Sequence, residues 1–180
     1  MPSAAVLALA VVLTGCADTG GLTLLTVDTD SYAVTPVGRT MAVVKVYDVR
    51  DVATMERTAL NVSMGRIYLD PPVVNVIEAV VQSAADSLMA ERSENEWPLL
   101  VMVGIQAFDI TTPSTALYWD MTAEVELVLR IEDTEVTASA KSVNRTYAWP
   151  SQKRLQIVLD EALGELSANL VSALTDLIDR

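Results

Sequence analysis

The chain has 180 residues, of which 51% are hydrophobic and 20% charged, and its formal net charge is −12. This length and composition suit one globular domain with a sizeable core. Because an acidic chain is repelled by phosphates, nucleic acid is not expected as a partner. The single cysteine excludes an intramolecular disulfide, and the absence of histidine removes a common metal ligand and the usual general base. We therefore expect no metal, no cofactor and no enzymatic activity.

An unbroken apolar run, residues 4–13, leads into Leu13-Thr14-Gly15-Cys16. The run is too short to span a bilayer, which needs about 20 residues, but it suits the hydrophobic region of a signal peptide. Leu-Thr-Gly-Cys resembles a bacterial lipobox. This resemblance implies cleavage between Gly15 and Cys16, and lipid chains on the thiol and the new amino group of Cys16. A buried strand is the alternative interpretation of the run.

The residues around this motif bear on location. Met1-Pro2-Ser3 lacks the positive charge with which signal peptides begin, so we expect the true start to lie upstream. By resemblance to lipoproteins of Gram-negative bacteria, Ala17 in place of aspartate favours the outer membrane, facing the periplasm, with the inner membrane as the alternative. Two or three acyl chains, palmitate among them, would anchor the protein firmly, at about 0.8 kcal/mol per buried methylene. The expected division is a signal peptide over 1–15, a lipidated tether over 16–39 and one periplasmic domain over 40–180.

The first half of the domain mixes strands with one helix. Residues 41–48 are β-branched and apolar and predict a strand, after which Asp48 and Arg50 are expected to fix a turn, with a binding pair as the alternative. Short strands are also expected within residues 21–27 and 61–69. Two prolines then start a helix over residues 73–91, where apolar residues recur at helical spacing.

The second half predicts three long strands and a helix. Residues 97–109 read as a central strand, and residues 118–132 alternate apolar and polar side chains, as in a strand with one wet face. Residues 135–147 return as its hairpin partner. Two basic side chains on this return strand, Lys141 and Arg145, are expected to neutralise acidic side chains across the hairpin. The acidic candidates are Glu124, Glu126 and Glu132. Ser151 is expected to cap a final helix with a leucine-rich stripe.

Three features of this half invite a functional interpretation. Glu124 and Glu126 could do acid–base chemistry, but a solvated strand face is the favoured reading, so no catalytic residue is assigned. The final helix carries basic residues at its start and acidic ones at its end, which the helix dipole disfavours by about 0.3–1 kcal/mol per charge. Aromatic residues also gather near strand ends, where they form either core edges or a partner surface; they are Trp97, Tyr118, Trp119, Tyr147 and Trp149.

These elements predict an α+β two-layer sandwich, with a mostly antiparallel sheet covered on one face by two amphipathic helices. Their order, together with the lipobox and the strand ending at Asp48-Val49-Arg50, resembles the YajG-like family of small bacterial lipoproteins and, more loosely, accessory lipoproteins of envelope transport systems. The resemblance implies a lipid-anchored, non-enzymatic protein that acts as an accessory or binding subunit beside an envelope protein partner. Cys16 is the only functional residue it carries over. The alternative is a carrier or sensor of a small apolar ligand held between sheet and helices.

Overall fold

The computed structural model describes residues 22–33, 42–50, 55–60, 62–90 and 99–179. The elements follow one another as β1 (Thr23–Thr26), the 3-10 helix η1 (Thr29–Tyr32), β2 (Ala42–Asp48), β3 (Met55–Ala59), β4 (Val62–Asp70), α2 (Val73–Ala90), β5 (Leu99–Thr111), β6 (Trp119–Ile131), β7 (Thr134–Thr146) and α3 (Gln152–Ile178).

The strands form one sheet in the order β1-β4-β3-β5-β6-β7, with β2 paired to β5. β5 is central: β6 runs along one edge, while the other edge pairs with β2 first and with β3 near its end. The two longest ladders, β5–β6 and β6–β7, are antiparallel, whereas β1–β4, β2–β5 and β3–β5 are parallel. The predicted α+β class is confirmed, and the sheet is open and mixed.

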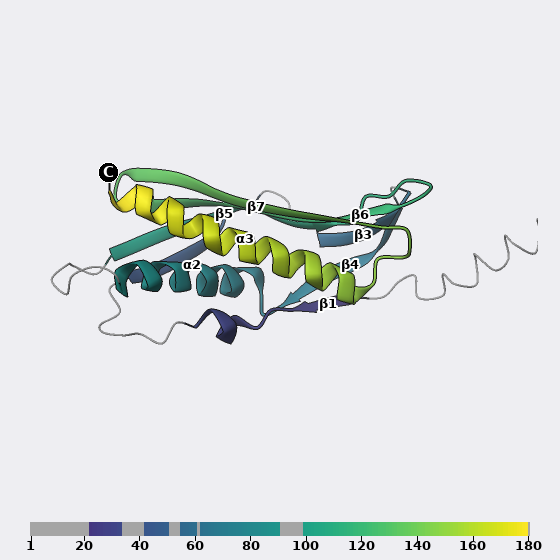
Figure 1. Ribbon diagram of the computed structural model, residues 1–180, viewed down its shortest axis with the longest axis horizontal. Coiled ribbons are helices and arrows are strands. Elements are labelled where there is room, and N and C mark those ends of the chain that lie inside the picture. Colours follow the sequence, from purple (N-terminus) through teal and green to yellow (C-terminus); the bar gives the residue numbers. More distant parts are fainter. Residues whose placement is uncertain (1–21, 34–41, 51–54, 61, 91–98, 180) are drawn as a thin grey trace, which may run out of the picture.

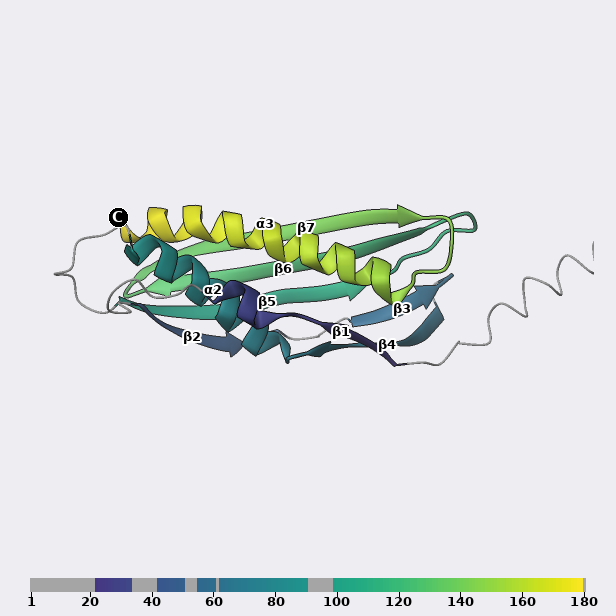
Figure 2. The same cartoon turned by 60° about the horizontal axis from the view of Figure 1, so that its bottom comes forward.

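Both helices lie on the same face of the sheet, as Figures 1 and 2 show. α3 has 27 residues, hence a length of about 40 Å, and extends along β6 and β7. On β6 the residues facing the helices are fully buried, and those between them face the open side of the sheet. The buried set consists of Met121, Ala123, Val125, Leu127 and Leu129. This alternation is the period of a strand with one covered face, as the sequence predicted.

The helices begin where local chemistry starts them. The carbonyl of Pro72 accepts the backbone N–H of Val76 at 3.2 Å, which opens α2 one residue after the two prolines. The hydroxyl of Ser151 accepts the backbone N–H of Arg154 at 3.4 Å, the cap that the sequence predicted for α3. The stripe of α3 that packs on the sheet is completely buried at most of its positions, among them Leu155, Leu159, Leu163, Leu166, Leu170 and Leu174.

The structure changes the expected picture of the N-terminal part. β1 pairs with β4, and Leu25 and Val27 are buried in the core. Residues 22–33 therefore belong to the folded domain, although the sequence assigned them to the tether. β3, which the sequence did not predict, is a short strand with a register shift between Arg57 and Thr58, so it shows no regular alternation.

Candidate functional site

One end of the domain, called here the loop end, gathers three connections between elements. They join β3 to β4, β5 to β6, and β7 to α3 (Figure 1). β1 begins on the same side, because Gln152 in the first turn of α3 donates to the carbonyl of Leu24 at 2.6 Å. The opposite end, the hairpin end, consists of the tight β6–β7 turn at Glu132 and Asp133 together with the end of α3.

Four of the five aromatic residues that the sequence places near strand ends, as core edges or a partner surface, come together at the loop end. The rings of Tyr118 and Tyr147 meet edge to face with their centroids 6.4 Å apart, and those of Trp119 and Trp149 do so at 5.9 Å. Such edge-to-face pairs are favourable beyond the area they bury. Trp97 lies outside the described residues.

Arg145 joins the tyrosine pair to the sheet. Its guanidinium carbon lies 3.9 Å from the ring centroid of Tyr118, and its Nε and Nη2 donate to the two carboxylate oxygens of Asp120 at 2.8 and 3.1 Å. This two-point hydrogen bond from Arg145 lowers the pKa of the Asp120 carboxyl. The sequence expected Arg145 to neutralise a glutamate of β6; it pairs with Asp120 instead, which is its direct neighbour in the ladder.

The tryptophan pair has a cation of its own. Arg57 on β3 is buried, and its guanidinium carbon lies 5.6 Å from the ring centroid of Trp149. Beside it, Arg154 in the first turn of α3 donates through Nη1 to the hydroxyl of Thr146. Aromatic rings and guanidinium groups from β3, β6, β7 and α3 thus fix the loops of this end to one another.

The loops themselves are held in defined shapes. The Thr115 hydroxyl accepts the backbone N–H groups of Leu117 and Tyr118, both at 3.2 Å, and so holds Leu117 at the tip of a tight turn. The backbone N–H of Leu60, in the turn after β3, donates to the Ser114 hydroxyl. Two loops far apart in sequence are therefore connected by hydrogen bonds.

These loops expose large apolar side chains. The five most exposed large hydrophobic residues among those described all lie at or beside the loop end: Leu117 and Tyr147 at 76%, Leu60 at 67%, Leu22 at 66% and Val62 at 61%. Leu60 also has a φ of 49°. The left-handed region usually holds glycine, asparagine or aspartate, so a leucine there is an outlier.

The remaining predicted charge pairs lie on the open face of the sheet. Lys141 donates to Glu124 at 2.6 Å across the hairpin, as the sequence predicted. Glu126 lies opposite Ser139, and neither glutamate lines the surface hollows described below. Both glutamates alternate with buried residues along β6 and so lie on the open face of the sheet.

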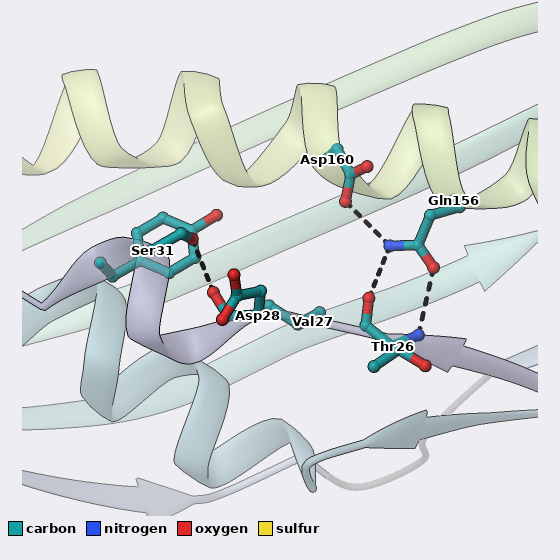
Figure 3. Close-up of a pocket in the computed structure, with 7 residues that line it drawn as sticks. Thr26, Val27, Asp28, Ser31, Gln156 and Asp160 are labelled. Carbon is teal, nitrogen blue, oxygen red and sulfur yellow. Dashed lines mark hydrogen bonds between the residues drawn. The ribbon is translucent and has the colours of Figure 1, made fainter.

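A hollow of about 530 Å³ lies between α3, the end of β1 and η1 (Figure 3). Gln156 forms one wall: its side-chain oxygen accepts the backbone N–H of Thr26 at 3.1 Å, and its nitrogen donates to the Thr26 carbonyl at 2.8 Å and to Asp160 at 2.8 Å. Burial, and secondarily the charge of Asp160, raises the pKa of Tyr32 in the same hollow. A second, smaller hollow lies between β7 and α3.

Where the structure describes the chain, buried side chains of the sheet and of both helices form one core cluster, and both hollows open to the surface. Within the same residues, no three potential metal ligands among histidine, cysteine, aspartate and glutamate cluster together. The described helices include none with the length and hydrophobicity needed to cross a bilayer.

The exposed leucines of the loop end were missed by sequence reasoning. Leu117 and Leu60 lie between strands, where no periodicity marks them as core or surface. The sequence feature that could have indicated the exposure of Leu117 is its place directly after the turn-forming residues Pro113, Ser114 and Thr115.

Cys16 and the bond between Gly15 and Cys16 lie outside the described residues, so lipidation and signal cleavage stay predictions.

The sequence matches no protein-family profile and no curated protein. The structure is similar to that of a DUF330 protein from Xanthomonas campestris, with 11% identity, a TM-score of 0.48, and coverage of 89% of this chain and 98% of that one. An uncharacterised protein has 10% identity and a TM-score of 0.40 over 85% and 91% of the two chains. The lipoprotein GNA1162 from Neisseria meningitidis has 15% identity and a TM-score of 0.27 over 77% and 97%.

Proposed function

We propose that the protein is a lipid-anchored lipoprotein of the bacterial cell envelope, without enzymatic activity, that serves as an accessory or binding subunit on the periplasmic face of the outer membrane. The observation that carries this proposal is the apolar run ending in Leu13-Thr14-Gly15-Cys16, with Cys16 as the only cysteine. A thiol is the nucleophile that takes a diacylglyceryl group as a thioether, and the small residues before it give a peptidase access to the bond.

The folded domain begins only a few residues after Cys16, which supports an anchor at that cysteine. Leu22, the first described residue, lies six positions after Cys16 and leads directly into β1. Anchoring a domain on so short a connection confines it to the membrane surface and raises its local concentration near partners in the same membrane.

The anchor is tested by replacing the thiol. The Cys16→Ser variant should incorporate no radiolabelled palmitate and should leave the membrane fraction, whereas the wild-type protein is labelled and sediments with membranes. If the variant still fractionates with membranes, the anchor hypothesis is wrong. An Ala17→Asp variant serves as the matched control for location: it should keep the lipid but move to the inner-membrane fraction of a density gradient.

The accessory role is tested by crosslinking in the intact envelope. A protein crosslinked in stoichiometric amounts to the wild-type chain, and lost with Cys16→Ser, would support it. A wild-type chain that yields only crosslinks to itself would contradict an accessory role while leaving the anchor in place.

A further inference from the structure

We propose that the loop end is a membrane-contacting surface, which places its exposed apolar side chains and basic residues against the headgroup region of a bilayer that contains anionic lipid. This inference rests on the proposed lipid anchor, since the anchor brings the domain to the membrane. It adds a defined orientation and a second contact with the lipid, made by side chains of the folded domain.

Chain length limits how far this end can lie from the bilayer. Leu22 lies six positions after Cys16, and a fully extended chain spans at most about 3.3–3.6 Å per residue, so Leu22 lies within about 22 Å of the anchored cysteine. β1 starts beside the first turn of α3, where Gln152 binds the carbonyl of Leu24. α3 has 27 residues, so the domain is more than about 40 Å long. When the start of β1 faces the anchored cysteine, the hairpin end therefore lies farther from that cysteine than the loop end does.

The apolar side chains of this end suit a lipid surface. Water-exposed apolar groups normally occur singly, and a group of them marks a contact site. Here the five most exposed large hydrophobic residues of the described chain gather at or beside one end, over three separate connections. Leu60 is presented from a left-handed backbone position that local preference would give to glycine or asparagine, and the turn made by Thr115 fixes Leu117 at its tip. Tyr147, on the edge of the tyrosine pair, adds an amphipathic ring of the kind enriched at membrane interfaces.

The charge distribution is complementary to anionic headgroups. Although the chain has a net charge of −12, the described residues that form the loop end (22–24, 57–60, 62, 112–120 and 145–154) hold four basic side chains and a single acidic one. They are Arg57, Arg145, Lys153 and Arg154, against Asp120. Asp120 is paired with Arg145, and Arg57 is buried beside Trp149, so Lys153 and Arg154 are the exposed cations of this end that can face the headgroups. The β6–β7 turn at the hairpin end is acidic, and so is the last turn of α3.

This polarity also accounts for the charges on α3. Lys153 and Arg154 stand at the start of the helix, where the dipole disfavours cations, and both are exposed. Long basic side chains at a membrane surface direct their charge to the headgroups while their stems cover apolar surface, an interaction that compensates for the dipole.

The orientation can be measured by placing a thiol probe at each end of the full-length, lipidated protein. A thioether at Cys16 leaves the wild-type chain without a free thiol. Ala116→Cys, next to Leu117, then provides one at the loop end, and Asp133→Cys provides the matched site in the β6–β7 turn; both positions are exposed. Each variant is labelled with a fluorophore and reconstituted into phosphatidylcholine vesicles with phosphatidylglycerol, in which a fraction of the lipid carries a nitroxide quencher at the headgroup.

The expected result is several-fold stronger quenching at position 116 than at position 133. Equal quenching at the two positions in a protein whose wild-type form takes no label would overturn the inference and leave the anchor intact. Labelling of the wild-type chain at Cys16 would instead refute the anchor. A probe at 116 that is shielded from aqueous iodide in native envelopes but is not quenched by nitroxide lipid would assign this surface to a protein partner, again overturning the inference.

A charge reversal tests the electrostatic part. Lys153→Glu should reduce quenching at position 116 in vesicles with phosphatidylglycerol and leave it unchanged in pure phosphatidylcholine. Lys45→Glu, an exposed lysine of β2 away from the loop end, is the control and should have no effect in either. A loss of equal size for the two variants would show that net charge alone acts, against a directed contact.

Discussion

Arg50 closes a gap in the edge of the central strand, and its removal should destabilise the domain measurably. β2 pairs with β5 only as far as Ile105, and β3 takes up the same edge from Ile110. Arg50 reaches into the interval between them and donates to the carbonyl of Phe108 at 3.1 Å. Its Nε and Nη2 donate to Asp48 at 2.8 and 2.5 Å. The pair therefore fixes the end of β2, as the sequence predicted.

The magnitude follows from these contacts. The Arg50 side chain is 8% exposed and that of Asp48 36%. Hydrogen bonds to a charged group contribute about 1.5–3 kcal/mol each when buried, and a partly exposed ion pair contributes less. Replacing Arg50 with methionine keeps the apolar stem and removes all three bonds, so we expect a loss of about 2–3 kcal/mol in the free energy of unfolding. For a domain of this size that lowers Tm by about 5–10 °C.

The loss should depend on pH in a defined direction. Arg50 lowers the pKa of Asp48 below the ordinary value of 3.8, so the pair's contribution is present above about pH 3.8 and is lost as the pH falls through the lower folded-state pKa. The bond from Arg50 to Phe108 does not titrate in this range. The difference between wild type and Arg50→Met should therefore be constant near neutral pH and shrink, without vanishing, in acid.

Urea unfolding followed by circular dichroism, with both chains in the Cys16→Ser background, measures this difference. Asp48→Asn and the double variant complete a cycle that isolates the pair, for which about 1 kcal/mol of coupling is expected because Asp48 is a third exposed. A change below about 0.5 kcal/mol for Arg50→Met, the range of ordinary surface substitutions, would refute the reasoning. So would a difference that stays undiminished in acid.

Three further predictions concern α3 and its neighbours. Leu163→Ala, at a fully buried position, should cost about 2–5 kcal/mol in urea unfolding because it leaves a cavity between helix and sheet. Gln156→Ala should speed hydrogen exchange at the backbone N–H of Thr26, the group that the glutamine oxygen accepts, while exchange within β6 stays unchanged. Asp160→Asn should lower the pKa of Tyr32 only partway towards 10.0 in an ultraviolet titration, because burial is the larger cause of its rise. The stabilising contribution of Tyr32 is present below pH 10 and is lost as the pH rises through its folded-state pKa.

Each of these has a clear contradiction. Val171→Ala, on the exposed side of the same helix, is the control for Leu163→Ala and should lower the free energy of unfolding much less. Equal losses of unfolding free energy for the two variants would contradict the assignment of Leu163 to the buried face of α3. Faster exchange throughout the sheet with Gln156→Ala would indicate global destabilisation in place of a local bond. A Tyr32 pKa that returns fully to 10.0 with Asp160→Asn would make charge, and not burial, the main cause.

The elements that the sequence predicted well are those that a single periodicity determines. β6 follows from strict alternation and α3 from its leucine stripe, and each has one face against the core, so the pattern and the packing agree. β3 escaped prediction because it is short, has an irregular register with its hairpin partner β4, and pairs on its other side with β5, which is distant in sequence. The parallel pairings of β1 with β4 and of β2 with β5 are contacts between distant segments, for which no local pattern exists.

The candidate surface was predictable only in part. Aromatic residues near strand ends indicated a cluster, because β6 and β7 form a hairpin and so bring Tyr118 near Tyr147. The contribution of Arg57 could not be foreseen, since it depends on the unpredicted strand β3. The exposure of Leu60 and Leu117 likewise depends on turn geometry that the sequence alone does not specify.

The placement of β1 has a mechanical consequence. A pull that reaches the domain through the chain before Leu22 acts along the axis of β1, whose four residues pair in parallel with Ile67–Asp70 of β4. Such a load shears the hydrogen bonds of the ladder together and does not unzip them one after another. On the other edge of the strand, Gln152 and Gln156 of α3 bind the backbone of Leu24 and Thr26. β1 is thus hydrogen-bonded on one edge to β4 and on the other to α3, so tension on the tether is transmitted directly to α3, the longest of the described helices.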